Sequence, residues 1–196
     1  ISPYLWVTQL AAVIVTILFS ANLTRTHFEM QKISFGVTPV LAFFAVPELL
    51  KSVVYGMSEL EGTCKNSAAK ILAARLFIIG STNLVAITII ITSISIRHSM
   101  PFTQAVIYGL VPFNIVNGVN LLIFHLAEIR SITVASSISL CLIALMRLMT
   151  ELSFFAAMSQ TMWLILFVAS TAFLLAELYS FVYSITSKKG VVIQWS

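Results

Sequence analysis

Apolar residues fill most of this chain in long blocks, and short polar segments separate the blocks. A helix that crosses a bilayer needs about 20 predominantly apolar residues, and six blocks reach or approach that length. These blocks cover residues 5–23, 33–50, 68–94, 102–126, 132–155 and 162–185. They lack the alternation of apolar and polar residues that marks the strands of a membrane β-barrel. The pattern therefore predicts an all-α bundle of six transmembrane helices that forms a single domain, residues 1–196.

The block 33–50 is the shortest of the six and contains Pro39 and Pro47. Proline removes a backbone donor and clashes with the preceding turn of a helix. Membrane helices tolerate such a residue where neighbouring groups satisfy the freed backbone atoms. We expect this helix to be kinked, broken or tilted.

Composition strengthens the membrane assignment. The chain is 59% hydrophobic and only 9% charged, its mean hydropathy is +1.02, and an average soluble domain is about 25% charged. So few charges do not cover the surface of a soluble protein of this length. The eleven basic residues are spread along the chain without interleaved aromatic residues, so we expect no nucleic-acid partner.

The basic residues predict the orientation of the bundle. An even number of crossings places both termini on one side of the membrane. With cytoplasmic termini, the cytoplasmic side collects Lys51, Lys65, Lys70, Arg75, Arg130, Lys188 and Lys189, and the outer side keeps Arg25, Lys32 and Arg97. Cytoplasmic loops carry an excess of lysine and arginine. The sequence therefore predicts cytoplasmic termini and a cytoplasmic connector at residues 51–67.

No catalytic motif is present in the chain. It has no aspartate, no G-x-S-x-G nucleophile elbow, no H-E-x-x-H zinc motif and no Gly-rich phosphate loop. We therefore assign no catalytic residue, no metal site and no cofactor, and we expect a protein that is not an enzyme. Any ATP hydrolysis linked to it is expected on a separate chain.

Four amides within the apolar blocks are candidates for a functional role. Asn114, Asn117 and Asn120 follow each other at three-residue steps on one broad helical face, and Asn83 lies in the block 68–94. Polar residues inside a membrane usually face the bundle interior or a water-filled path. Two interpretations remain open: the amides line a translocation path, or they hold neighbouring helices together by hydrogen bonds.

Three charged residues within the blocks are further candidates. Arg147 and Glu151 are four residues apart, a spacing at which two side chains meet on one helical face. Glu177 has no partner nearby in sequence, and Arg75 is predicted at a similar depth. A structural ion pair, hydration near the interface and a role in a substrate path or proton relay all remain open for Glu177.

The connector 51–67 is the longest polar loop predicted on the cytoplasmic side. Its stretch SELEGT can form a short helix, in which Ser58 caps the start, Glu61 completes a capping box and Gly62 ends the helix. The simpler interpretation is a solvated loop with ordinary surface charges.

The segment AVPELLKSVVYGMSELEGTCKNSAAKILAARLFIIGSTNLV, residues 45–85, resembles a known family. Its order of an inward helix, an acidic connector and a basic residue near the start of the next span is similar to the type-2 ABC exporter permeases. It is closer still to a branch of small six-helix membrane proteins from clostridia, in which a PELL, ELE and ARL pattern lies beside a VPF segment, here residues 111–113. The resemblance covers most of residues 38–126.

This resemblance implies a function and partners. In such permeases the connector docks into a groove on a separate ATP-binding subunit. The residues implied for this ATPase coupling are Lys51, Ser58, Glu59, Glu61 and Lys65. The chain is then expected to be a permease subunit in a bacterial plasma membrane, exporting an amphipathic or lipid-like substrate. Its expected partners are an ABC ATPase subunit, a second permease half in a homodimer or heterodimer, and membrane lipid.

One feature departs from the family pattern, because the link 152–161 is short for the re-entrant pair that many of these permeases carry there. This departure leaves open that the chain is an accessory or degenerate half without a full translocation path. Two other functions also stay open. The chain is alternatively a non-transporting membrane regulator or anchor whose connector holds a cytoplasmic signalling partner, or an enzyme of unrecognised mechanism.

Overall fold

In the computed structural model of the protein, the described residues are 3–21, 35–44, 68–98, 101–126, 132–152, 155 and 157–190. Within this part of the chain there are six helices and no strand, which confirms the all-α prediction. The helices are α1 (Pro3–Ala21), a short helix Phe35–Phe44, α4 (Ala68–His98), α5 (Phe102–Leu126), α6 (Ile132–Met149) and α8 (Gln160–Gly190).

Four of these helices are long and apolar enough to cross a membrane. The stretches that qualify are Ala74–Ile96, Phe102–Ile123, Ile132–Met149 and Gln160–Phe181. Trp6–Leu18 and Phe35–Phe44 are apolar but shorter. By length and composition the chain is thus a helical membrane protein with four candidate spans among its described residues.

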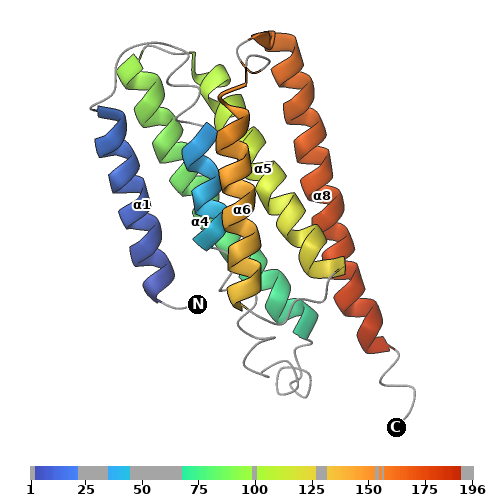
Figure 1. The fold of residues 1–196 in the computed structure, drawn as a ribbon. Coiled ribbons are helices and arrows are strands. Elements are labelled where there is room, and N and C mark those ends of the chain that lie inside the picture. The colour runs from blue at the N-terminus through green and yellow to red at the C-terminus, as the bar shows by residue number, and fades with distance from the viewer. Residues whose placement is uncertain are drawn as a thin grey trace.

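The helices alternate in direction along the bundle (Figure 1). The first turn of α1, the first turn of α4 and the last turn of α8 lie at one end, which we call the terminal end. α5 packs against α4, α6 and α8, and its contact with α8 is the most extensive in the bundle. α1 lies at the edge and packs on α4.

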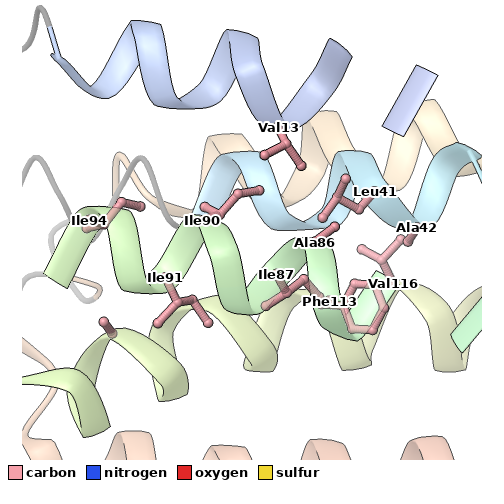
Figure 2. Packing of buried hydrophobic residues seen from close by; sticks show 11 residues of the cluster. Val13, Leu41, Ala42, Ala86, Ile87, Ile90, Ile91, Ile94, Phe113 and Val116 are labelled. Carbon is pink, nitrogen blue, oxygen red and sulfur yellow. The ribbon is translucent and has the colours of Figure 1, made fainter. Parts of the chain in front are cut away.

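One apolar core joins α1, the short helix, α4 and α5 (Figure 2). Ile87, Ile90 and Ile94 are fully buried and follow each other at three- and four-residue steps on one face of α4. Val13 of α1 and Leu41 of the short helix point toward this face. α4 therefore supplies the apolar surface on which α1 and the short helix pack.

A second, aromatic cluster closes the other end of the bundle, where α8 begins. Trp163 is buried there, and its ring lies edge-on to Phe35, Tyr108 and Phe155 with centroid distances of 5.8, 5.0 and 5.2 Å. Edge-to-face pairs at such distances are favourable beyond the area they bury. The cluster ties the short helix and α5 to the start of α8.

The ends of two helices differ from the apolar blocks. α6 ends at Met149, where the block continued to residue 155, and turn residues follow. The Thr150 hydroxyl donates to the Arg147 carbonyl oxygen at 2.7 Å, which occupies a carbonyl at the end of the helix. α8 extends to Gly190, beyond the end of the apolar block at residue 185. Its last turn is polar, so hydropathy did not predict this extension.

Proline does not end the helices in which it lies. The short helix continues through Pro39, which is buried, and α5 continues through Pro112. Pro47 lies outside the described residues. We expected the helix of block 33–50 to be kinked, broken or tilted. Within this block the structure describes one helix of ten residues, Phe35–Phe44.

The outer helices are scarcely buried. Half of the α5 span is buried within the chain, compared with 11% of the α6 span and 6% of the α8 span. Lipid or another protein chain must therefore cover most of the surface of α6 and α8.

Gly118 sets how closely α5 approaches α8. A Cβ atom at this position would lie 2.6 Å from Cε1 of Phe173. We expect Gly118→Ala to lower the free energy of unfolding by about 1–3 kcal/mol, because the ring or the helix must move. The measurement is unfolding of the detergent-solubilised protein, followed by circular dichroism.

Gly80 provides the matched control. A Cβ atom on Gly80 meets no other atom within 4 Å, so Gly80→Ala is expected to be neutral or stabilising by up to about 1 kcal/mol. Equal effects of the two substitutions would show that the close approach at Gly118 is unimportant.

Candidate functional site

Polar side chains in the apolar helices form hydrogen bonds between neighbouring helices. Gln9 Nε2 donates to Asn83 Oδ1 and joins α1 to α4. Asn114 Nδ2 donates to Thr171 Oγ1 at 3.0 Å and joins α5 to α8. The Ser139 hydroxyl donates to Asn120 Oδ1 at 2.9 Å and joins α6 to α5. Each of the described helices of spanning length takes part in one of these bonds.

The three asparagines of α5 do not converge on one path. Asn114 bonds to α8 and Asn120 bonds to α6, whereas Asn117 Nδ2 donates to the Phe113 carbonyl of its own helix at 2.9 Å. Steps of three residues turn the helix by about 300°, so the amides diverge toward different neighbours. Asn114 and Asn120 therefore hold α5 between α6 and α8.

Among the described residues, two buried side-chain atoms have no hydrogen-bond partner, Asn120 Nδ2 and Trp163 Nε1. Oδ1 of Asn120 accepts a hydrogen bond from Ser139, whereas its Nδ2 has no acceptor. Trp163 makes T-shaped contacts with the rings of Tyr108 and Phe155. Such contacts stabilise the indole beyond the area they bury.

Arg147 and Glu151 form the ion pair that their spacing predicts, with 3.5 Å between Arg147 Nη2 and Glu151 Oε1. Both side chains are more than half exposed, and Arg147 Nη1 also donates to Thr150 Oγ1 at 2.9 Å. A Cβ atom added at Gly36 of the short helix would lie 3.5 Å from Cδ of Arg147, so the stem of Arg147 passes close to this glycine. This pair therefore lies on the surface, at the end of the bundle away from the termini.

Glu177 is half-buried on α8. Among the described residues, the structure shows the salt bridge of Arg147 with Glu151. An ion pair of Glu177 with a cation of another helix stays a prediction.

The residues expected to couple to an ATPase, Lys51, Ser58, Glu59, Glu61 and Lys65, lie outside the described residues. The structure does describe the start of α4 at Ala68, directly after the connector. That first turn lies at the terminal end of the bundle (Figure 1).

Several members of these contacts carry little or no signal in the sequence. Gln9 lies alone in an apolar block, and a polar residue in a span is itself a signal for a buried partner. Thr171 gave no such signal, because threonine commonly bonds to its own helix, as Thr171 also does to the Phe167 carbonyl. The sequence does not distinguish Trp163 from other apolar residues, because its partner Phe35 lies in the short helix, far away in sequence.

Comparison with protein families, with characterised proteins and with solved structures found no match to this chain. In the described part of the chain, no three histidine, cysteine, aspartate or glutamate side chains are grouped in a way that could hold a metal ion. The polar contacts between the helices are thus the functional candidates that the geometry offers.

The bond from Asn114 to Thr171 can be tested by a double-mutant cycle. With Asn114→Ala and Thr171→Val, we expect a coupling energy of about 0.6 kcal/mol and at most about 1.7 kcal/mol, the range for such bonds in membrane proteins. The measurement is the free energy of unfolding of the four proteins in mixed micelles.

Asn117→Ala in place of Asn114→Ala is the control cycle, because Asn117 bonds to its own helix. It is expected to show no coupling to Thr171. A coupling as large as that of Asn114 would contradict the interhelical bond.

Proposed function

We propose that the chain is the transmembrane permease subunit of an ABC-type exporter in the plasma membrane of a bacterium. In this function it couples ATP hydrolysis on a separate ATPase subunit to the export of an amphipathic or lipid-like substrate. The observation that carries the proposal is the position at which α4 begins. Its first turn shares the terminal end with the first turn of α1 and the last turn of α8.

A coupling element must leave the membrane on the side of the ATPase. The connector 51–67 leads directly into α4, so the position of Ala68 supports its emergence at the terminal end. The excess of lysine and arginine predicted for that side supports a cytoplasmic location. In the proposed function Glu59 and Glu61 offer negative charge to a basic groove on the ATPase.

The permease would work as one half of a dimer, whether of identical or different halves. The exposed surfaces of α6 and α8 support this, because two outer helices of one chain remain available to a second half and to lipid. The interhelical amides are bonded within the chain. A polar path for substrate is therefore more consistent with the boundary between two halves than with the interior of one.

The same hydrogen bonds favour a second candidate function. A bundle whose amides hold its own helices together is also suited to a membrane anchor or regulator that transports nothing. In that case the connector 51–67 would hold a cytoplasmic signalling protein.

The proposal predicts a partner and a specific sensitivity to charge. The full chain, purified in mild detergent from its native membrane, is expected to co-purify with a second protein in a fixed stoichiometry. Mass spectrometry is expected to identify a P-loop in this second protein. The double reversal Glu59→Lys with Glu61→Lys is expected to weaken this association at least tenfold, about 1.4 kcal/mol, and to uncouple ATP hydrolysis from transport.

Glu151→Lys is the matched control, because it reverses an exposed carboxylate at the opposite end of the bundle. It is expected to leave the association and the coupling unchanged. If the double reversal behaves like Glu151→Lys, the connector is not the docking segment. Recovery of a signalling protein without any ATPase would favour the anchor or regulator instead.

A further inference from the structure

A groove of about 440 Å³ runs between α1 and α4 at the edge of the bundle. Its walls combine apolar side chains with three polar ones, Gln9, Ser81 and Thr82. The lining residues are Trp6, Gln9, Leu10, Val13, Ser81, Thr82, Val85, Ala86 and Ile89.

The groove lies within the apolar part of the bundle. Its α4 wall, from Ser81 to Ile89, falls inside the candidate span Ala74–Ile96. Eight residue steps of α-helix make it about 12 Å long. Trp6 lines it near the start of α1, at the terminal end, and tryptophan favours the boundary between lipid and water.

The floor of the groove is mainly apolar, and Val13 and Ala86 are buried there. Gln9 donates to Asn83, and the Thr82 hydroxyl donates to the Ile79 carbonyl at 2.9 Å. Two of the polar side chains that line the groove are therefore already bonded within the bundle. Pockets with mostly apolar walls suit apolar occupants.

The rim of the groove faces outward from the bundle. Leu10, Val85 and Ile89 are exposed on it by 62%, 60% and 47%. At the depth of a membrane span, the medium around the bundle is the hydrocarbon of the bilayer. Lipid tails therefore have direct access to an apolar hollow that no described side chain fills.

The surroundings of the groove favour a lipid tail as its occupant. The exposed rim residues Leu10, Val85 and Ile89 open the groove toward the hydrocarbon of the bilayer. A hydrocarbon chain is narrow enough to lie lengthwise along a hollow of about 12 Å. Pockets of a few hundred Å³ with mostly apolar walls are typical of sites for small ligands.

We propose that this groove binds one acyl chain of a membrane phospholipid, which enters past Trp6 and lies along α1 and α4. The inference does not rest on the exporter function, because the groove belongs to one chain and needs no ATPase. Failure of either proposal leaves the other standing.

The test counts lipid that stays on the purified full chain. The protein is reconstituted in dioleoylphosphatidylcholine, extracted again in maltoside detergent, washed and weighed by native mass spectrometry. We expect about one retained phospholipid per chain. Val85→Phe, which places a ring in the groove, is expected to reduce this retention at least fivefold.

Leu84→Phe is the matched control, because Leu84 is the neighbouring exposed apolar residue and does not line the groove. It is expected to retain lipid as the natural chain does. Circular dichroism must show equal helix content in both variants. Ala86→Leu, which narrows the groove from its floor, provides a second blocking variant if Val85→Phe does not fold.

A second measurement locates the chain within the groove. Phosphatidylcholine with brominated acyl chains is titrated into the detergent-solubilised protein, and tryptophan fluorescence is recorded. We expect quenching that saturates near one equivalent, and Trp6→Phe is expected to remove the saturable part. Trp163 and Trp195 are retained in Trp6→Phe, so the part of the quenching that this variant removes comes from Trp6.

Three results would overturn the proposal. The first is the loss of all lipid from a natural chain that stays folded. The second is equal retention by Val85→Phe and Leu84→Phe. The third is an oligomer that Val85→Phe dissociates without any change in retained lipid, because the groove would then be an interface between copies of the chain.

Discussion

Lipid tails are as apolar as leucine, so burying leucine between membrane helices gains little from the hydrophobic effect. Association then depends on close packing and on hydrogen bonds, and both are concentrated on α5. Gly118 lets the backbone of α5 approach the ring of Phe173 on α8, and this pair of helices makes the most extensive contact of the bundle. Gly109 has a similar role on the other side, since a Cβ there would lie 3.0 Å from Ile91 Cδ1 of α4.

The hydrogen bonds specify which helices become neighbours once packing brings them together. Asn114 bonds α5 to α8, and Asn120 bonds α5 to α6. Gln9 bonds α1 to α4 and so fixes the position of α1. An amide left unpaired in hydrocarbon is costly, so a bundle with α5 rotated away from these partners is disfavoured. The unpaired Asn120 Nδ2 shows that this satisfaction is incomplete at one point.

The sequence predicted the helical class well, because length and hydropathy directly reflect the solvent that a membrane helix meets. It also predicted that Arg147 and Glu151 would pair, since both partners lie on neighbouring turns. It did not predict that Asn114 would bond to Thr171, which is 57 residues away. It placed the three asparagines of α5 on one broad face, and the divergence of the amides across that face decides which neighbouring helix each one reaches. Long-range partners depend on packing, and hydropathy contains no information about packing.

The distribution of burial connects the fold to both proposals. Among the four candidate spans α5 is the most buried, while α6 and α8 are exposed along most of their spans. A freestanding bundle would meet lipid on these faces, and a permease half would give part of them to its second half. The groove lies elsewhere, between α1 and α4 at the edge of the bundle. A second half seated on α6 and α8 would therefore leave the groove open to the bilayer, so lipid binding and assembly of the halves are compatible in one molecule.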